Sequence, residues 1–294
     1  MTKTNLVFIL LLKLLVDTTA FAHPGSGIAI DKFGQIYFTD TGKGVWKIDT
    51  HGKLIYMPAS EFHWMTIDPD GYFAESQKSF GMYFERVTSK SSKPALIICS
   101  DFPLVVNFDG NIYYANTRSN SGKIIRRSPE GKESELTSNR IFEFTNGITS
   151  GKDGSLYITE SSNANFNTIR KITMYGTVSI IATFVGESAS KPPLETVHSY
   201  CRGLSIDSLD NLYVAATGSR SVLKITPQGK VITLLQESSP WTPTGVVVAR
   251  GEVYVLEWHD VTSEKMEIRS AWIPRIRKIG VNGKVTTLAT VSRN

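Results

Sequence analysis

One unit of sequence returns six times along this chain, and this repeat constrains the fold more than any other feature. Each copy begins with a short apolar segment that opens with Gly or a substitute, and continues through a polar turn into a segment centred on Tyr. A third segment, often containing Lys-Ile, and a Gly-Lys turn into a fourth segment complete the unit. The clearest copies are residues 27–40, 147–160 and 203–216. A repeat of this length indicates the architecture before any single motif is considered.

The period and the pattern within it predict strands. The copies begin 38 to 56 residues apart, which leaves room for four short strands and matches a propeller period of about 40 to 50 residues. Their first residues are Gly27, Met65, Leu104, Gly147, Gly203 and Gly245. A helical repeat would need apolar residues at i, i+3, i+4 and i+7, whereas here they alternate or form short blocks rich in β-branched and aromatic types. We predict an all-β fold, a six-bladed β-propeller of four-stranded antiparallel blades, as a single domain over residues 23–294.

The turns support this prediction. Asp70-Gly71, Asp109-Gly110 and Asp153-Gly154 close the first hairpin of three copies. Tight hairpins need residues with positive φ, which Gly adopts without strain. A Gly also stands in the second hairpin of most copies, at positions 52, 131, 176, 229 and 283.

The first 22 residues are typical of a signal peptide. Lys3 supplies a positive start, residues 6–12 are wholly apolar, and Ala20-Phe21-Ala22 has the small-x-small pattern of a cleavage site. Lys13 interrupts the apolar run, which argues against a membrane-spanning helix. We therefore expect a mature protein that is secreted or periplasmic after cleavage near Ala22, with no stable insertion into the membrane.

The charge distribution argues against one class of partner, and the cysteine content limits the possible disulfides. The chain has a formal net charge of +5, and its cations are scattered over repeated strand positions. This distribution favours a solvated outer face over a nucleic-acid surface. Cys99 and Cys201 are compatible with a disulfide in an oxidising compartment and equally with two buried thiols.

Two groups of segments resemble known repeats. Residues 27–41 and 275–288 resemble NHL repeats, and Asn146-Gly147-Ile148 followed by residues 153–159 resembles the senescence marker protein and gluconolactonase-type propellers. The resemblance covers essentially the whole mature chain and implies a six-bladed propeller. It implies no single activity, because this architecture supports lactonases, lyases and plain binding modules.

Strand direction predicts where a site lies. The connections between blades and the turns between second and third strands should emerge on one face, and the long segments of this sequence fall there. Binding residues normally sit on such elaborated loops. The residues expected around the channel, before each first strand, are Ser26, His63, Trp64, Pro103, Asn146, Arg202 and Thr244. Those expected to end the second strands are Asp40, Glu75, Asn116, Glu160, Ala216 and Glu257.

A ligand site is predicted from the first of these rings. Arg202 near Asn146 and Trp64 would clamp a carboxylate, sulfate or phosphate, because its planar fork gives two parallel hydrogen bonds. Glu75, His198, His259 and Trp258 are further ligand-binding candidates on the same face. The structural alternatives are a salt bridge from Arg202 to Glu160 or Glu257, and packing of the tryptophans between blades.

The resemblance also implies a bound metal ion and a catalysed reaction. Gluconolactonase-type enzymes hold a divalent cation in the channel through Glu, Asn and Asp. Asn146 matches the Asn position, but Arg202 stands at the Asp position, and the Glu is replaced around residues 23–25. The metal candidates are Asn146, Glu160 and Glu257, for calcium or zinc, and the candidate catalytic residues are His63, Glu160 and Glu257.

Three functional hypotheses follow. The first is an exported propeller that binds a small anionic or sugar-like molecule at the channel mouth. The second is a metal-assisted lactone or ester hydrolase, or a lyase, that uses the same channel. The third is a platform for a protein partner. Because neither end of the predicted domain supplies a spare strand to a neighbouring blade, we also expect the first and last blades to meet by side-chain packing alone.

Overall fold

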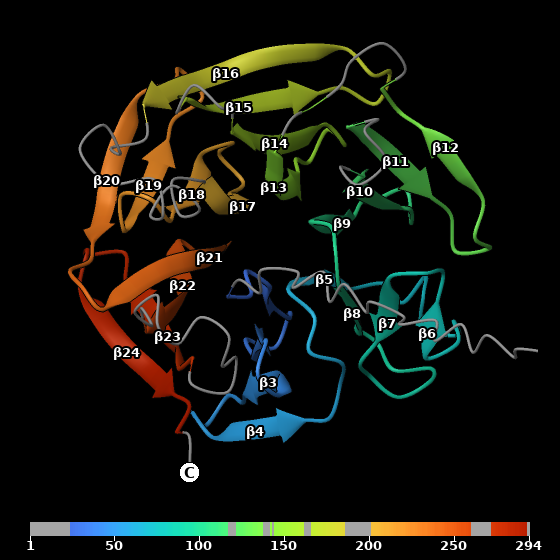
Figure 1. Ribbon diagram of the computed structural model, residues 1–294, viewed down its shortest axis with the longest axis horizontal. Coiled ribbons are helices and arrows are strands. Elements are labelled where there is room, and N and C mark those ends of the chain that lie inside the picture. The colour runs from blue at the N-terminus through green and yellow to red at the C-terminus, as the bar shows by residue number, and fades with distance from the viewer. Residues whose placement is uncertain are drawn as a thin grey trace, which may run out of the picture.

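The structure, a computed structural model, describes residues 24–116, 122–137, 142, 144–161, 166–185, 201–259 and 272–292. In these residues, strands β1 to β24 form six four-stranded antiparallel sheets arranged as blades around a central axis (Figure 1). The predicted fold class, an all-β six-bladed propeller, is confirmed.

The first three blades occupy residues 28–135. Blade 1 contains β1 (Ile28–Ile30), β2 (Ile36–Asp40), β3 (Gly44–Ile48) and β4 (Leu54–Met57). Blade 2 contains β5 (Trp64–Asp68), β6 (Ser79–Phe80), β7 (Phe84–Arg86) and β8 (Ala95–Cys99). Blade 3 contains β9 (Leu104–Val106), β10 (Ile112–Asn116), β11 (Lys123–Arg127) and β12 (Glu133–Glu135).

The last three blades complete the ring. Blade 4 contains β13 (Phe144–Ser150), β14 (Leu156–Ser161), β15 (Phe166–Ile172) and β16 (Val178–Val185). Blade 5 contains β17 (Cys201–Ile206), β18 (Leu212–Ala216), β19 (Ser221–Ile225) and β20 (Val231–Gln236). Blade 6 contains β21 (Trp241–Ala249), β22 (Glu252–His259), β23 (Pro274–Ile279) and β24 (Val285–Thr290). In Figure 1 the first strands lie nearest the axis, and β4, β12, β16, β20 and β24 form the circumference.

Blade 2 is connected differently from the others. Its sheet order is β5-β8-β7-β6, so the chain passes from the innermost strand to the outermost and returns inward. The strands of this blade nevertheless alternate in direction as in the other blades. β8 runs antiparallel to β5, and its last residue, Cys99, pairs with Trp64 at the start of β5. The prediction that a second strand ends at Glu75 is therefore wrong. Cys99 ends the strand in the second position of this blade.

The recurring Tyr of the second strand has a structural role. Tyr113 and Tyr213 donate hydrogen bonds to acidic side chains in the preceding turn, at 2.8 Å to Asp109 and 3.0 Å to Asp207. Asp207 also accepts the backbone N–H of Asn211, which fixes the turn. Burial and the Asp207 hydrogen bond raise the pKa of Tyr213 to about 12. The Tyr-centred strand and the polar turn before it are thus one hydrogen-bonded unit.

Glycines at the first strands permit close contact between blades. A Cβ on Gly203 would lie 2.6 Å from the Cα of Gly245, and one on Gly147 would lie 2.1 Å from the backbone oxygen of Arg202. Real Cβ atoms do not approach backbone atoms so closely, so these positions require Gly. The Gly that opens several copies of the repeat therefore reflects packing around the axis.

The segment before β1 closes the ring between blades 6 and 1. The backbone oxygen of Gly25 accepts hydrogen bonds from Thr244 Oγ1 at 2.7 Å and from Trp258 Nε1 at 2.8 Å, both from blade 6. The N–H of Ser26 donates to the backbone oxygen of His63, at the start of blade 2, at 2.8 Å. An apolar cluster that includes Phe38 and Trp258 fills the same seam. Side-chain packing was expected to act alone there, and these hydrogen bonds add to it.

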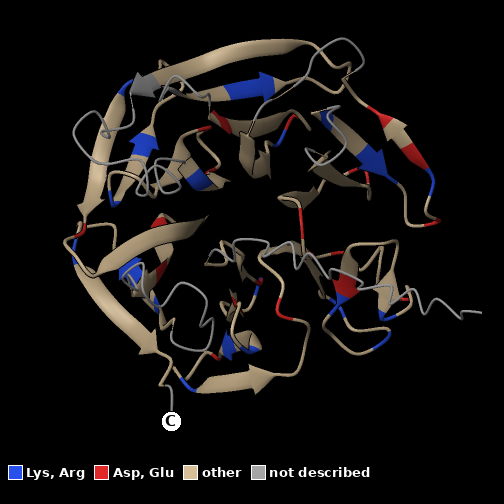
Figure 2. Cartoon of the chain, in the orientation of Figure 1, with Lys and Arg blue, Asp and Glu red and all other residues tan. Residues whose placement is uncertain are grey.

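Three further observations concern the surface and the thiols. Lys and Arg recur on the third strands β11, β15 and β19 around the ring, and do not gather on one side (Figure 2). Cys99 and Cys201 are free and buried in separate apolar clusters. They are therefore two buried thiols and do not form a disulfide with each other. Among the described residues, no helix is long and apolar enough to cross a bilayer.

Candidate functional site

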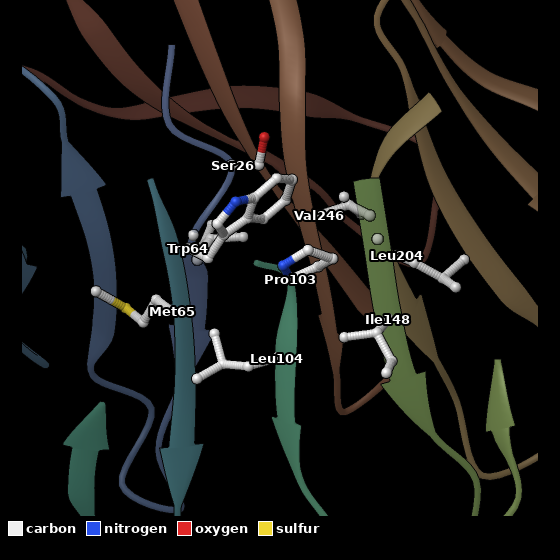
Figure 3. A pocket seen from close by; sticks show the side chains of 12 residues that line it. Ser26, Trp64, Met65, Pro103, Leu104, Ile148, Leu204 and Val246 are labelled. Atoms are coloured by element: carbon white, nitrogen blue, oxygen red, sulfur yellow. The ribbon is translucent and has the colours of Figure 1, made fainter. Parts of the chain in front are cut away.

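A narrow cavity lies on the propeller axis. It has a volume of about 50 Å³ and is lined by the first strands of all six blades. Ser26, Trp64 and Pro103 lie at the level where these strands begin, and Leu104 and Ile148 lie further along them (Figure 3). The end of the cavity nearest the strand starts therefore faces the elaborated side of the ring.

Three first strands carry a bulge at the mouth of this channel. The pairing register shifts between Thr145 and Gly147 in β13, between Cys201 and Leu204 in β17, and between Pro243 and Gly245 in β21. A bulge adds one residue to the strand and changes the direction of its side chain. The extra residues are Asn146, Arg202 and Thr244, all predicted members of the ring around the channel.

Arg202 reaches across the mouth. Its side chain is 4% exposed, and Nη1 donates a hydrogen bond of 2.8 Å to the backbone oxygen of Pro24. Pro24 precedes blade 1, whereas Arg202 belongs to blade 5, and blade 6 lies between these two blades. The guanidinium therefore joins two blades that are not neighbours.

His63 and the two predicted tryptophans also lie near this end. His63 is half-buried, and its Nδ1 lies 3.0 Å from the backbone oxygen of Ser100. Trp64 is buried and lines the cavity while it packs in the apolar cluster between blades 2 and 3. Trp258 is buried in the seam between blades 6 and 1. Both tryptophans thus pack between blades, which was the alternative to a ligand-binding role. Trp64 also lines the channel cavity.

Glu160 and Glu257 are paired with arginines of their own blades. Arg170 Nε donates to Glu160 Oε2 in blade 4, and Arg275 Nε donates to Glu257 Oε2 at 2.5 Å in blade 6. Neither glutamate lines the channel cavity. The alternative prediction was a salt bridge from Arg202 to one of these glutamates. Arg170 and Arg275, and not Arg202, form the ion pairs with them.

Glu257 belongs to a buried cluster of charged side chains in blade 6. It is fully buried, and Arg275 also lies 3.3 Å from Glu237 and stands over the ring of Trp241, with its Cζ 3.8 Å from the ring centroid. His259 makes an edge contact with the same indole, with ring centroids 5.3 Å apart. Burial raises the pKa of Glu257 from its ordinary value of 4.5 to about 7, against the opposing effect of Arg275.

This raised pKa predicts a stability loss between pH 4.5 and 7. The folded state holds a proton on Glu257 in that window and the unfolded state does not, so stability falls as pH rises, by up to about 1.4 kcal/mol per unit. The contribution is complete below pH 4.5 and absent above pH 7. Glu257→Gln should flatten this part of the profile, measured by urea unfolding at several pH values.

Glu252 on the same strand provides a control for that experiment. A hydrogen bond from Lys278 lowers the pKa of Glu252, so its contribution is lost as the pH falls and not as it rises. Glu252→Gln should therefore leave the slope between pH 5 and 7 unchanged. A Glu257→Gln profile that coincides with the wild-type profile in this window would contradict the assignment.

Two predicted ligand-binding residues do not join this face. Glu75 is exposed in the segment between β5 and β6, on the opposite face of the ring, where it accepts a hydrogen bond from Ser91 Oγ at 2.5 Å. A hydrogen bond from Ser91 lowers the pKa of Glu75. The prediction that Glu75 lies on the elaborated face is wrong, because blade 2 is connected differently. His198 lies outside the described residues.

Comparison with solved structures places this geometry among known folds. Virginiamycin B lyase from Staphylococcus aureus is 18% identical over 92% of this chain and 85% of its own, with a TM-score of 0.53. A PQQ-bound aldose sugar dehydrogenase from Streptomyces coelicolor is 10% identical over 80% of this chain and 88% of its own, with a TM-score of 0.56. The calcium-binding protein regucalcin from Agrobacterium tumefaciens is 13% identical over 79% and 81%, with a TM-score of 0.50. This chain has a six-bladed β-propeller fold.

The sequence itself has no such match. No protein-family model matches it. No curated protein matches it either. Identities below 20% establish the fold of the propeller and leave its activity open.

In the part of the chain that the structure describes, the predicted metal ligands do not fit the divalent cation that the resemblance implies. Nowhere in the described ranges do three or more His, Cys, Asp or Glu side chains gather closely enough to hold a metal ion. Of the predicted ligands, Glu160 and Glu257 are each paired with an arginine, and Asn146 is half-buried at the bulge of β13. An arginine on a carboxylate opposes the binding of a cation there.

Sequence reasoning missed the partners that organise this end of the propeller. No role was predicted for Arg170 and Arg275, and Pro24 and Gly25 were noted only as part of the segment that replaces the Glu of the gluconolactonase-type pattern. A usable signal existed for Arg275, because a Glu that ends a second strand directly faces the residue that begins the third. No comparable signal identified Pro24 and Gly25, since their role depends on ring closure.

Proposed function

We propose that this chain is an exported binding protein that holds a small anionic or sugar-like ligand at the mouth of its central channel. The observation that carries the proposal is the placement of Arg202, whose guanidinium lies buried across the mouth and reaches Pro24 on the far side. The planar fork of an arginine binds carboxylate, sulfate and phosphate groups, so its position close to the channel axis favours a ligand role.

The surroundings of Arg202 support the same function. Asn146 stands at the corresponding bulge of the neighbouring blade, and the contact between Gly147 and the Arg202 backbone shows how near these two strands are. Ser26 contributes a hydroxyl at the rim. An anion that reaches the mouth would thus meet a planar cation and neutral hydrogen-bonding groups, while Glu160 and Glu257 are engaged by Arg170 and Arg275.

Substitution of Arg202 tests this function. Acetate, sulfate, D-gluconate and D-glucose are titrated into the purified protein by calorimetry. The ligand that binds should lose about tenfold or more of its affinity in Arg202→Ala, because a hydrogen bond to a charged group contributes about 1.5 to 3 kcal/mol. Arg202→Lys should retain part of the affinity, because it keeps the charge and loses the fork.

Arg250 supplies a matched control. It lies in the turn between β21 and β22, and its Nη2 donates a 2.8 Å hydrogen bond to the backbone oxygen of Lys32, so it also joins another blade to blade 1, but on the opposite face. Arg250→Ala should leave affinity unchanged. Equal affinities of wild-type protein and folded Arg202→Ala for every ligand that binds would overturn the proposal.

A second candidate is proton-transfer chemistry at blade 6. Glu257 has a pKa near 7, which suits a general acid or base at neutral pH, and His259 lies two residues further along β22. A lyase or hydrolase reaction would use this pair. Turnover of a panel of lactones and aryl esters, abolished in Glu257→Gln, would support it, and the absence of turnover by wild-type protein would remove it.

A further inference from the structure

The face opposite the channel mouth carries exposed apolar side chains on its turns. This face is formed by the turns that follow the first and third strands, and in blade 2 by the segments that lead into β6 and β8. Residues in the middle of such a turn lie at its tip, so their side chains project from the face. The exposed large apolar residues of these turns are Phe33, Tyr72, Phe108, Tyr175, Leu209 and Val281.

Over blades 2 to 4 these side chains form a continuous band. A Cβ on the turn glycine of blade 3, two residues after Phe108, would lie 2.8 Å from the Tyr72 ring of blade 2. A Cβ on the turn glycine of blade 4 would contact the Phe108 ring and would lie 3.2 Å from Cγ of Met174. Each ring therefore rests on the turn of the next blade, and Phe108 remains 63% exposed. We call Tyr72, Phe108, Met174 and Tyr175 the apolar band.

Lysines lie at the rim of the same face. The Gly-Lys turn of the repeat leads into β4, β12, β20 and β24, which belong to the circumference in Figure 1. The turns into β20 and β24 contain no acid, and those into β4 and β12 contain one each, Asp49 and Glu130. In the described part of the chain, no carboxylate lies within ion-pair distance of these exposed lysines. They are Lys53, Lys132, Lys230 and Lys284.

Carboxylates beside the apolar band are paired with cations of third strands. Asp109, the residue after Phe108, lies 3.5 Å from Arg126, and Asp153 lies 2.8 Å from Lys171. The charges of each pair offset one another, whereas those of the rim lysines are not offset in this way. The face therefore combines an apolar band with positive charge at its rim.

A lipid surface fits this combination better than a protein partner does. Lysine is depleted in protein interfaces, whose centres are apolar and closely packed. At the surface of a bilayer, by contrast, aromatic rings lie at the level of the headgroups, and lysines beside them are attracted to anionic lipids. Side chains carried on rigid turns at one end of the ring also suit a flat partner.

We propose that this face docks reversibly on an anionic lipid bilayer. The apolar band enters the headgroup layer, and the rim lysines contact lipid phosphate groups. The channel mouth then points away from the bilayer, towards the solution. The docking uses no residue of the mouth, so it goes beyond the proposed function and does not depend on it.

Co-sedimentation with vesicles tests the docking. The exported protein without its leader is mixed with vesicles of phosphatidylcholine alone, or of phosphatidylcholine and phosphatidylglycerol in equal parts. The anionic vesicles should bind the protein, with a partition coefficient that falls several-fold as salt is added, because salt screens the lysines. Phosphatidylcholine vesicles should bind it several-fold less. An equal or lower partition coefficient on the anionic vesicles at low salt would overturn the proposal.

Substitutions on the two faces provide the matched comparison. Phe108→Ser should lower the partition coefficient on anionic vesicles about fivefold or more, because a large apolar side chain no longer leaves water. Met82→Ser, at an 83% exposed residue in the turn between β6 and β7 on the mouth face, should leave it unchanged. Lys230→Gln should lower it about fivefold, and Lys43→Gln, on the mouth face, should not. Equal partition coefficients within either pair would contradict the proposal.

Sedimentation velocity without vesicles distinguishes another occupant of this face. The wild-type protein and Phe108→Ser should sediment alike. A wild-type dimer that Phe108→Ser dissociates, together with no binding to anionic vesicles, would assign the face to a second copy of this chain and overturn the proposal.

Discussion

Replacing Gly203 with alanine is expected to destabilise the folded ring by about 3 kcal/mol or more, at the upper end of what overpacking costs. The added Cβ would lie 2.6 Å from the Cα of Gly245 and 2.7 Å from the backbone nitrogen of Val246. Both are backbone atoms of the neighbouring first strand, so no side-chain rotation can relieve the contact. Blades 5 and 6 would have to separate, and the channel between them would change shape. Thermal and urea unfolding measure the loss.

Gly280→Ala is the matched control for this substitution. Gly280 lies in the turn between β23 and β24 of blade 6, and the nearest neighbour of a Cβ added there is the side chain of Asn282, at 3.1 Å. That side chain can move, so we expect a change below about 1 kcal/mol. Similar losses in Gly203→Ala and Gly280→Ala would show that the first strands are not packed closely around the axis.

Removal of Arg275 is expected to cost about 3 to 5 kcal/mol, the usual penalty for breaking a buried ion pair. Arg275→Met keeps much of the side-chain volume over Trp241 but leaves two carboxylates, Glu257 and Glu237, without the guanidinium between them. Glu257 is fully buried and cannot recover hydration without a local opening of blade 6. Urea unfolding at pH 8, where Glu257 is ionised, should show the full effect.

Two variants make this result interpretable. Arg126 occupies a third strand too, in blade 3, but it is half exposed and lies 3.5 Å from Asp109. Arg126→Met should cost less than about 1 kcal/mol, as exposed ion pairs do. Adding Glu257→Gln to Arg275→Met should restore part of the stability, because it removes the buried charge. A double variant no more stable than Arg275→Met would contradict an electrostatic origin.

The repeat predicts most of the fold because the local pattern and the global architecture agree. The turns with Gly at positions 52, 131, 176, 229 and 283 all have positive φ, as tight hairpins require. The six predicted starts lie within, or at the first residue of, a first strand in all copies but one, and Gly27 directly precedes β1. Periodicity suffices here because each blade is built from contiguous strands.

Blade 2 shows where the repeat misleads. Residues 72–75 have the Tyr-centred pattern of a second strand, but Asp68 accepts the N–H groups of Gly71 and Phe73 and curls the segment into a turn. The central position requires residues that are apolar on both faces, and Ala95–Cys99 meets this requirement because all five are buried. The apolar segment Ala95–Cys99 therefore takes the second position of blade 2, although residues 72–75 stand at that place in the repeat.

The candidate site was predictable only in part. Arg202 and Asn146 stand where the repeat has a bulge, and their departure from the shared pattern identified them. Glu160 and Glu257, near the ends of second strands, do not point at the axis. Each second strand pairs with the third strand of its own blade, where Arg170 and Arg275 form ion pairs with these carboxylates. First strands and the residues directly before them line the channel cavity, a distinction that strand direction alone does not provide.

A crystal of the protein soaked with 3-bromopropionate tests the account most directly. Bromine gives an anomalous signal that locates the bound molecule. We predict one bromine peak at the mouth of the channel, with the carboxylate directed at Arg202. An empty mouth, or a bromine peak there with the carboxylate directed away from Arg202, would contradict the account.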